Sequence, residues 1–567
     1  MQVNELFRQS NTILLDGGMG TMLQAAGLKL GARPEELNIT DPALIEGIHG
    51  QYAAAGSRIV NANTFGASAH KLAGSAYTLE QVITAGIENC KRACAPYGAL
   101  TALDVGPLGE LLEPSGTLAF EDAVAEYARI VKAGEAAGAD LIFFETYTDL
   151  YELKAALLAA KENTRLPILA SMSFEAGGRT FTGCTVESFA ATARGLGADA
   201  VGINCSLGPK EIFPMAKRLA EAVPGNFPVF VKPNAGLPRA DGSGYDITPQ
   251  LFALQMKPYR ELHLFAAGGC CGTTPEFIKL LNGTFAGCTP GRPAHRMPSV
   301  LCTPVDTVTV DGITVVGERI NPTGKKRFQQ ALREGDMNYV LEQAVSQAEA
   351  GAQILDVNVG APGVDEPVLM EQVVKALQSV TSLPLQLDSS NVEALARGLR
   401  VYNGKPIVNS ADAGSRISYI DLAAANDAIC IALCSADGIA KDNEERMMHC
   451  HHMLERGLSL GMEATDLWFD PLFLVVKGMQ DKQMDVLNAI KLFSDEGLKS
   501  TGGLSNNSNG APKNVRPIMD SALVAMAMMQ GLTSAIVNPN DLRLMETIKS
   551  CDVFKGNTLY ADSYLEI

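Results

Sequence analysis

Two adjacent cysteines, Cys270 and Cys271, stand in the glycine-rich segment FAAGGCCGTTPEF, 265–277, between an apolar run and a helical pattern. Neighbouring side chains of a regular strand point to opposite faces, so the backbone must leave strand geometry if both sulfurs are to converge. The flanking glycines would permit this, because glycine tolerates positive φ and close approach. Two converging thiols favour a soft metal ion, most often zinc.

A third cysteine and an asparagine end other apolar runs of the same half. Cys205 follows DAVGIN, and Asn234 ends PVFVKPN. Three thiolates with one open position are typical of catalytic zinc, whereas structural zinc usually has four protein ligands. An all-thiolate zinc site suits a soft ligand, so a substrate thiol in the open position would bind as the nucleophilic thiolate. We expect the remaining cysteines to be small buried hydrophobes. They are Cys90, Cys94, Cys184, Cys288, Cys302, Cys430, Cys434, Cys450 and Cys551.

Further polar residues follow apolar runs of the first half. Asp16 and Glu145 could bind the ammonium group of an amino-acid substrate, although single acids at such positions are often only caps or solvated groups. The other candidates for this binding site are Asn63, Thr64 and Thr146.

The second half has acids and amides where its apolar runs end: Glu318, Asp356, Asn358, Asp388, Asn409, Asp470 and Asn506. Any single aspartate among them is as readily a helix cap as a ligand. Buried carboxylates and amides must be hydrogen-bonded, so the set as a whole indicates a binding site for a flat, nitrogen-rich ring. A carboxylate can accept two parallel hydrogen bonds from an amino-pyrimidine edge, much as it does from arginine.

The segment MMHCHHML resembles a metal site only in composition. His449 and His452 are three residues apart and would share one face of a helix. No acid or thiol at a strand end joins them, so we expect no metal there.

Apolar runs alternate with alanine-rich helical patterns throughout the 567 residues, which indicates parallel sheets. Each half contains eight such runs, so the sequence predicts two consecutive (β/α)8 TIM barrels, with open doubly wound sheets as the alternative. We expect one barrel over 1–290, a proline-rich linker over 291–312 and a second barrel over 313–567. In each barrel the functional groups should gather at the carboxyl ends of the strands.

Composition excludes several classes of protein. A net charge of −17 argues against nucleic-acid binding and gives no reason to expect membrane attraction. The sequence has no signal-peptide pattern and no apolar run of about 20 residues that could span a bilayer. Twelve cysteines in such a chain are expected to be reduced, which predicts a cytoplasmic protein.

Six motifs of the first half are DGGMGT, NANTFGA, ETYTD, GINCSLGP, PNAGLP and GGCCGTTPEF. Together they resemble the zinc-dependent homocysteine S-methyltransferase family over about the first 290 residues. The resemblance implies that Cys205, Cys270 and Cys271 bind zinc, that the sulfur of homocysteine takes the fourth position, and that Asn234 is a ligand only when substrate is absent.

In the second half, GERINPTGKKRF and LDVNVGAPGVDE resemble the methyltetrahydrofolate methyltransferase branch of the pterin-binding family. The resemblance implies that Asp388, Asn409 and Asp470 hold the pterin edge, with Glu318 nearby. It places Asn506 near N5, the atom that carries the methyl group, and makes Arg516 a further candidate. One departure is Ser508-Asn509-Gly510, where an aromatic residue is expected.

The two modules in this order resemble the N-terminal half of the cobalamin-dependent methionine synthase family. The implied methyltransferase moves a methyl group from 5-methyltetrahydrofolate through cobalamin to the homocysteine thiolate, with Asn506, Asp388 and Glu145 as catalytic residues. No DxHxxG stretch, the cobalamin-binding signature, occurs in the sequence. We therefore expect cobalamin to be carried by another domain or by a separate corrinoid protein. The alternatives are a fusion to a flavin-dependent methylenetetrahydrofolate reductase and a non-catalytic sensor of zinc and folate.

Overall fold

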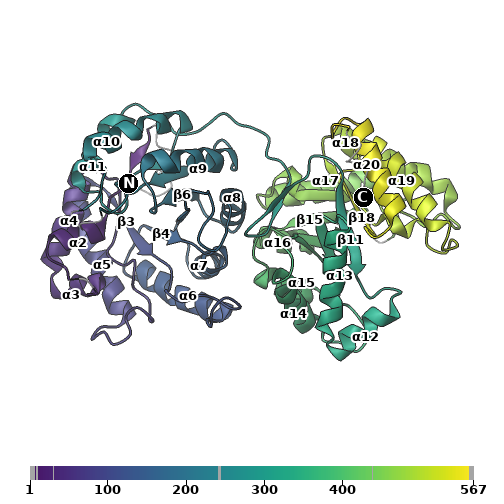
Figure 1. The fold of residues 1–567 in the computed structure, drawn as a ribbon, viewed down its shortest axis with the longest axis horizontal. Coiled ribbons are helices and arrows are strands. Elements are labelled where there is room, and N and C mark those ends of the chain that lie inside the picture. The colour runs from purple at the N-terminus through teal and green to yellow at the C-terminus, as the bar shows by residue number, and fades with distance from the viewer. Residues whose placement is uncertain (1–6, 8–10, 30, 240–243, 437, 561–567) are drawn as a thin grey trace. The chain divides into compact units, whose positions relative to one another are not determined.

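The structure is a computed structural model that describes residue 7 and residues 11–29, 31–239, 244–436 and 438–560. The chain divides into two compact units, Met1–Arg296 and Met297–Ile567. In each unit helices surround a sheet of eight parallel strands (Figure 1). The prediction of two consecutive (β/α)8 barrels is therefore confirmed. Among the described residues, no helix has both the length and the apolar composition needed to cross a bilayer.

The strands of the first barrel coincide with the eight apolar runs of the first half. They are β1 (Ile13–Leu14), β2 (Ile59–Asn61), β3 (Leu100–Val105), β4 (Leu141–Tyr147), β5 (Ile168–Met172), β6 (Ala200–Asn204), β7 (Val229–Lys232) and β8 (Ala266–Ala267). From β2 to β8 each strand pairs with the next, and β1 pairs with β8. The Arg58 amide donates to the Leu14 carbonyl oxygen at 2.7 Å, which joins β2 to β1 and closes the barrel.

The helices that cover this barrel have clear start signals. Thr78 and Gln81 form a capping box at the start of α5, and Asp149 caps α7 by accepting from the Tyr151 amide. The helices are α2 (Met19–Ala25), α3 (Leu37–Thr40), α4 (Pro42–Ala55), α5 (Leu79–Cys94), α6 (Phe120–Ala136), α7 (Leu150–Asn163), α8 (Val186–Gly195), α9 (Pro209–Glu221), α10 (Pro249–Gln255) and α11 (Pro275–Phe285), with 3-10 turns η1 (Pro34–Glu36), η2 (Ala95–Tyr97) and η3 (Lys257–Leu262).

The interior of the first barrel changes from apolar to polar along the strands. Its apolar layers include Leu100 and Ala102 of β3 and Phe143 of β4, which belong to one buried cluster. Inward positions of a strand recur every second residue. The next inward positions towards the carboxyl ends are therefore polar, and they form the floor of the barrel mouth. The floor residues are Asn61, Asp104, Glu145, Ser171, Asn204 and Lys232, all buried.

The second barrel repeats this architecture. Its strands are β11 (Thr314–Ile320), β12 (Ile354–Val357), β13 (Leu385–Asp388), β14 (Ile407–Asp412), β15 (Ile429–Leu433), β16 (Leu467–Asp470), β17 (Lys499–Ser500) and β18 (Ser534–Val537). The strand β18 pairs with β11, and the Ile536 amide donates to the Gly502 carbonyl oxygen at 3.0 Å, which closes the ring beside β17.

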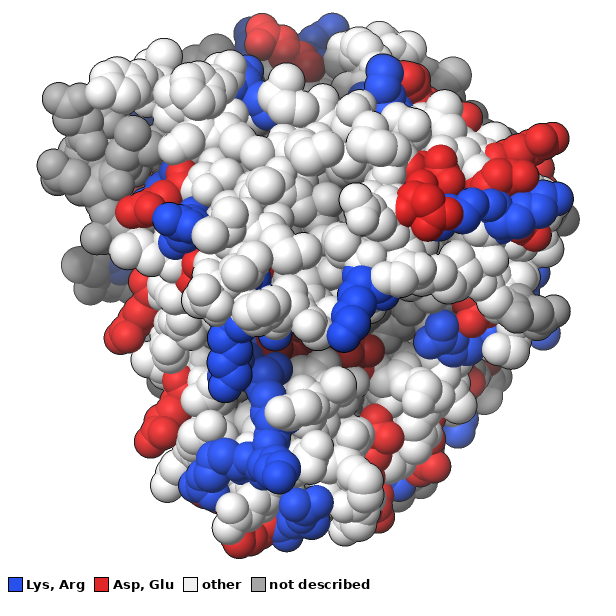
Figure 2. All heavy atoms as spheres, turned by 90° about the vertical axis from the view of Figure 1, so that its right-hand side faces the viewer, with Lys and Arg blue, Asp and Glu red and all other residues white. Residues whose placement is uncertain are grey.

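The helices of the second barrel are α12 (Lys326–Glu334), α13 (Met337–Glu349), α14 (Glu366–Gln378), α15 (Val392–Val401), α16 (Ser418–Ala425), α17 (Asn443–Ser459), α18 (Gln483–Asp495), α19 (Arg516–Met529) and α20 (Leu542–Phe554), with 3-10 turns η4 (Ala464–Asp466), η5 (Gln480–Lys482) and η6 (Leu504–Asn506). The outer face of α19 is apolar: Ile518, Met526 and Met529 are exposed. On the side of the molecule where α18, α19 and α20 lie in Figure 1, charged side chains leave a broad uncharged area between them (Figure 2).

The segment expected as a linker, 291–312, contains an antiparallel hairpin of β9 (Val300–Cys302) and β10 (Thr307–Thr309). Leu301 and Val310 belong to the same buried cluster as Trp468 and the inward residues of the second barrel. The Trp468 indole donates to the Ser299 hydroxyl at 2.8 Å. The hairpin is thus part of the second unit, and it closes the end of the barrel opposite the carboxyl ends of the strands.

Candidate functional site

Three thiols converge at the mouth of the first barrel. The sulfur atoms of Cys205, Cys270 and Cys271 all lie within 4.8 Å of one another, and those of Cys205 and Cys271 are 3.8 Å apart. Within the described parts of the chain, this is the one group of three or more histidine, cysteine or acidic residues placed closely enough to hold a metal ion. The structure therefore brings together the three cysteines that the sequence singled out.

Local backbone geometry explains the convergence. Cys205 and Ser206 have positive φ values of 63° and 59°, which turn the chain inward directly after β6. On the other side of the cluster, Gly272 has a φ of 80°. A Cβ atom on Gly268 would lie 2.7 Å from Leu15 Cβ, so this glycine is required by close approach rather than by its φ angle.

The cluster stabilises a thiolate. Hydrogen bonds from the thiols of Cys205 and then Cys270 lower the pKa of Cys271 to about 3. A thiolate is the form of cysteine that binds metal. Zinc–sulfur bonds of about 2.3 Å place the sulfurs of a tetrahedral site about 3.8 Å apart, so the spacing of Cys205 and Cys271 fits zinc.

Two asparagines orient the thiols. The Asn234 side-chain oxygen accepts from the Cys271 amide at 3.0 Å, so in this structure it holds the backbone of the cysteine pair. The Asn204 amide nitrogen lies 3.7 Å from the Cys270 sulfur and also donates to the Thr146 hydroxyl at 2.7 Å. Asn204 thereby connects the thiol cluster to the end of β4, where Thr146 has a positive φ of 67°.

A buried lysine joins the two acids that were expected to bind an ammonium group. Lys232 Nζ lies 2.9 Å from Glu145 Oε2 and 3.1 Å from Asp16 Oδ1. It also lies 4.9 Å from the centre of the Phe143 ring, below the floor. Burial raises the pKa of Glu145 to about 7, and burial also raises the pKa of Asp16. Lys232 and the neighbouring Asp104 are not among the residues predicted from the sequence, although the two-residue alternation of β7 and β3 places both inward.

The other two candidates of the first mouth have structural hydrogen bonds. The Asn63 amide nitrogen donates to the Pro34 carbonyl oxygen at 2.8 Å and to the Asn38 side-chain oxygen at 2.9 Å. The Thr64 hydroxyl donates to the Asp104 carbonyl oxygen at 2.8 Å. Both residues thus fix the loop after β2, and their role in substrate binding stays a prediction.

The mouth of the second barrel gathers the predicted acids and amides. The Asn358 amide donates to Asp388 Oδ2 at 3.0 Å, and the Asn409 amide donates to Asp356 Oδ1 at 3.3 Å. A second donor to Asp356 is Gln386, at 2.6 Å, which the sequence analysis did not select. Burial raises the pKa of Asp388 to about 6 and raises the pKa of Asp356 well above its usual range.

Two further acids stand at the same mouth. Burial raises the pKa of Asp470 to about 7, although its Oδ1 accepts from the Leu472 amide at 2.7 Å. Glu318 Oε2 accepts from the Ser505 hydroxyl at 2.5 Å, which ties β11 to the loop that carries Asn506. These contacts bring residues from β11 and β16 and the loop after β17 to one end of the barrel.

Arg516 organises the loop that follows β17. Its guanidinium donates to the Ser508 hydroxyl at 3.0 Å, to the Ser505 carbonyl oxygen at 3.3 Å and to the Asn509 side-chain oxygen at 3.2 Å. Asn506 lies within this loop, in η6. The serine and asparagine that replace the expected aromatic residue are thus the residues that Arg516 binds.

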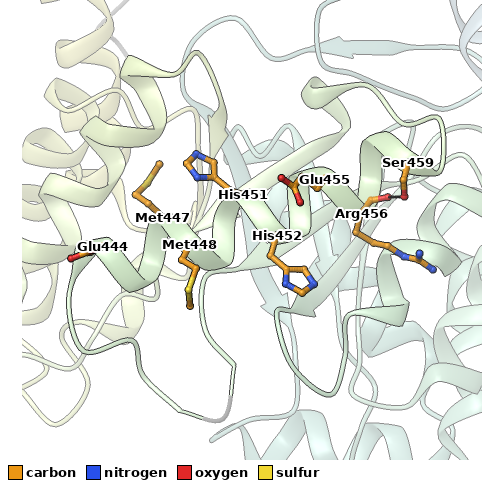
Figure 3. Close-up of a pocket in the computed structure, with 8 residues that line it drawn as sticks. All are labelled: Glu444, Met447, Met448, His451, His452, Glu455, Arg456 and Ser459. Carbon is orange, nitrogen blue, oxygen red and sulfur yellow. Dashed lines mark hydrogen bonds between the residues drawn. The ribbon is translucent and has the colours of Figure 1, made fainter.

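The histidine-rich segment forms the outer surface of α17. His451 and His452 line an open groove with other residues of the same helix. Their rings point to different sides of the helix (Figure 3). His451 pairs with Glu496 at 2.8 Å, and Cys450 is buried.

Both halves of the chain match known family models. Residues 13–285 match the model of homocysteine S-methyltransferase, and residues 317–538 match the model of pterin-binding enzymes. The curated methionine synthases of Mycobacterium leprae and Mycobacterium tuberculosis are each 29% identical, over 93% and 94% of this chain. The chain spans about half the length of these relatives, 47% and 48%.

Solved structures resemble each half separately. The oxidised homocysteine methyltransferase MmuM from Escherichia coli is 24% identical, with 50% of this chain and 98% of that chain covered and a TM-score of 0.44. The dihydropteroate synthase from Xanthomonas albilineans with 7,8-dihydropteroate is 16% identical, with 46% of this chain and 100% of that chain covered and a TM-score of 0.37.

Proposed function

Because this chain joins a domain of the homocysteine S-methyltransferase family to a domain of the pterin-binding family, we propose that it transfers a methyl group from 5-methyltetrahydrofolate to homocysteine. The products are methionine and tetrahydrofolate, and cobalamin carries the methyl group between the two sites. The observation that carries the proposal is the cluster of Cys205, Cys270 and Cys271 at the mouth of the first barrel.

The three cysteines would hold a zinc ion. Bound there, zinc would supply Lewis acidity that keeps the sulfur of homocysteine deprotonated at neutral pH. The chain's own residues do the rest of the positioning. Asn204 and Asn234 orient the cysteine pair, and the acids of the floor attract the ammonium group of the amino acid.

The second mouth would bind the pterin ring of the folate. Asp388, Asn409 and Asp470 offer acceptors and a donor for its amino-pyrimidine edge. Asn506 would lie near N5. A neutral tertiary amine holds its methyl group firmly, so hydrogen bonds that stabilise the protonated amine in the transition state favour methyl release.

Cobalamin has no site assigned in this chain. The sequence contains no DxHxxG stretch, so we place cobalamin on another domain or on a separate corrinoid protein. The two half-reactions are therefore assayed with free cobalamin added. Methyl transfer from methyltetrahydrofolate to homocysteine in the complete absence of a corrinoid would contradict this division.

Replacing one thiol tests the zinc site. Cys271→Ala should lower bound zinc and slow methyl transfer from added methylcobalamin to homocysteine by about 10³-fold, since a bound metal contributes several kcal/mol. The measurements are zinc per chain by atomic emission and the rate of methionine formation.

The matched control is Cys551→Ala, because Cys551 is a half-buried thiol in α20 of the second unit. It should leave zinc content and rate unchanged. Wild-type methyl transfer by Cys271→Ala would discard the zinc-thiolate site. Absence of methyl transfer by the unaltered chain would leave a non-catalytic sensor of zinc and folate as the alternative.

A further inference from the structure

A site built from three thiolates offers a methyl donor more than one sulfur to attack. The thiolate is the nucleophilic form of sulfur, and Cys205, Cys270 and Cys271 would all be thiolates when they hold zinc beside the substrate thiolate. Methylation of a ligand sulfur turns it into a neutral thioether and disables the site. A chain that methylates many substrate molecules therefore needs ligand sulfurs that are less nucleophilic than the substrate sulfur.

A tyrosine contacts one of these ligand sulfurs. Tyr245 is half-buried, and its hydroxyl donates a hydrogen bond to the Cys271 sulfur. Its ring stands directly against the next residue of the chain, Gly272, where an added Cβ atom would lie 2.3 Å from Tyr245 Cγ. Because position 272 is a glycine, no side chain pushes the ring away from the cysteine pair.

The loop after β7 holds this tyrosine in place. The Ala235 amide donates to the Cys271 carbonyl oxygen at 2.9 Å, and the Ile247 amide donates to the Ala235 carbonyl oxygen at 3.0 Å. Asp246 closes the loop, because its Oδ1 accepts from the Leu237 amide at 2.9 Å. The same backbone contacts that join the loop to the cysteine pair thus fix the position of the tyrosine hydroxyl.

The other member of the cysteine pair has a donor of the same kind. The Asn204 amide nitrogen lies 3.7 Å from the Cys270 sulfur. Two of the three sulfurs therefore receive a hydrogen bond from a side chain outside the cluster. A hydrogen bond to a thiolate disperses its negative charge and lowers its nucleophilicity. Each of these bonds favours methylation of the substrate sulfur over methylation of the ligand.

We propose that Tyr245 is a positioning residue whose hydroxyl protects Cys271 from methylation and so directs the methyl group to the substrate sulfur. The inference rests on the proposed function, since it takes methylcobalamin as the methyl donor. In the reaction that Tyr245 suppresses, the Cys271 sulfur forms a bond to the methyl carbon and the cobalt–carbon bond breaks. The electron pair of that bond leaves with cob(I)alamin, and Cys271 remains as an S-methyl thioether.

Removing one hydroxyl tests this role. Tyr245→Phe keeps the ring against Gly272 and deletes only the hydrogen-bond donor. The zinc-loaded full chain is incubated with homocysteine and excess methylcobalamin, and peptide mass spectrometry measures the fraction of Cys271 that carries a methyl group. This fraction per methionine formed should rise about tenfold or more in the variant, the effect expected of one hydrogen bond to a charged group. Zinc per chain should fall as the methylated fraction rises.

A second measurement needs no methyl transfer to homocysteine. Iodoacetamide alkylates thiolates with loss of iodide, and peptide mass spectrometry gives the rate at each cysteine of the zinc-loaded chain. The rate at Cys271 should rise about tenfold in Tyr245→Phe. The rate at Cys551, which is half-buried in α20, should stay unchanged.

The matched control is Tyr97→Phe. Tyr97 lies in η2, just before β3, at the end of the barrel opposite the thiols. This variant should methylate and alkylate Cys271 at the wild-type rates.

Equal alkylation of Cys271 in the wild type and in Tyr245→Phe overturns the inference and leaves the proposed function standing. Loss of zinc from Tyr245→Phe before any methyl donor is added also overturns it, since the hydroxyl would then be a metal ligand. A wild-type chain that forms no methionine overturns the proposed function, and with it the role in methyl transfer, whatever the alkylation rates.

Discussion

Two buried carboxyl groups at the second mouth have raised pKa values. Burial raises the pKa of Asp388 to about 6 and that of Asp470 to about 7. Both groups bind protons more tightly in the folded chain than in the unfolded chain. They therefore lower the free energy of unfolding as pH rises from about 4 through 7. Their ionised form is the form present above this range, and it is the form that the proposed function requires to accept hydrogen bonds from a pterin edge.

We predict that affinity for methyltetrahydrofolate rises with pH and levels off above about 7.5. Binding requires the ionised carboxylates, so the Kd should be at least about tenfold higher at pH 5.5 than at pH 8. Calorimetric titration across this range is the measurement. Asp388→Asn should bind more weakly throughout and keep only the pH dependence due to Asp470. A flat profile in the wild type would exclude both acids from the binding step.

The residues missed by the sequence analysis share one cause. Cys205, Cys270 and Glu145 were found because they follow or end apolar runs. Lys232 and Asp104 lie inside their runs, where a single charged residue among apolar residues leaves the strand pattern unchanged. Counting every second residue from Phe230 or Ala102 would have placed both in the mouth. Their pairing could not be predicted, because it depends on which strands are neighbours across the closed barrel.

At the scale of elements, the loop after β17 depends on one side chain. Arg516 is the first residue of α19, and its guanidinium reaches three residues of the preceding loop. The planar guanidinium presents several N–H donors in fixed directions, so it can bind several acceptors at once. A lysine ammonium group cannot reproduce this geometry.

Arg516→Ala should release this loop and raise the Kd of methyltetrahydrofolate about tenfold, because misplacing a positioning group weakens binding geometry. The melting temperature should fall by less than about 4 °C, as the loss is about 1 kcal/mol. Arg516→Lys should restore only part of the affinity. Arg543→Ala, on the exposed face of α20, is the control and should bind like wild type. Unchanged affinity in Arg516→Ala would show that the loop has no part in folate binding.

The hairpin of β9 and β10 is an element that the sequence pattern concealed. Its prolines and short strands favoured a linker, whereas its burial depends on contacts with Trp468 and the inward residues of the second barrel. Such contacts are long-range and leave no periodicity in a segment of this length. The barrel strands other than β17, by contrast, were predictable from local pattern alone.

Leu301→Ala should lower the free energy of unfolding of the second unit by about 2–5 kcal/mol, since Leu301 is fully buried. Trp468 is the only tryptophan of the sequence and bonds to the hairpin, so its fluorescence during urea unfolding reports this unit alone. The control is Thr309→Ala, on the exposed face of β10, with an expected change within about 0.5 kcal/mol. Equal urea midpoints for Leu301→Ala and wild type would mean that the hairpin does not stabilise the second unit.

At the scale of the molecule, each barrel has its own interior. The buried apolar clusters of the described chain each belong to a single unit. A ligand stabilises only the unit that binds it, by about 2.7 kcal/mol at a concentration one hundred times its Kd.

Zinc with homocysteine should therefore raise the urea midpoint for unfolding of the first unit and leave the midpoint recorded by Trp468 fluorescence unchanged. Tetrahydrofolate should raise the midpoint recorded by Trp468 fluorescence and leave that of the first unit unchanged. Far-ultraviolet circular dichroism records both units, so the two signals together separate the transitions. Equal shifts of both midpoints by either ligand would show that the units unfold as one.

The polar floor restricts where this chain can gain or lose residues. Loops at the mouth can gain or lose residues while the strands keep their register. A single-residue deletion within β7 would shift every following side chain by one position and turn Lys232 from the interior to the helix-facing side. Insertions and deletions tolerated by this protein should thus be confined to its loops, because strand length fixes which side chains reach the substrate.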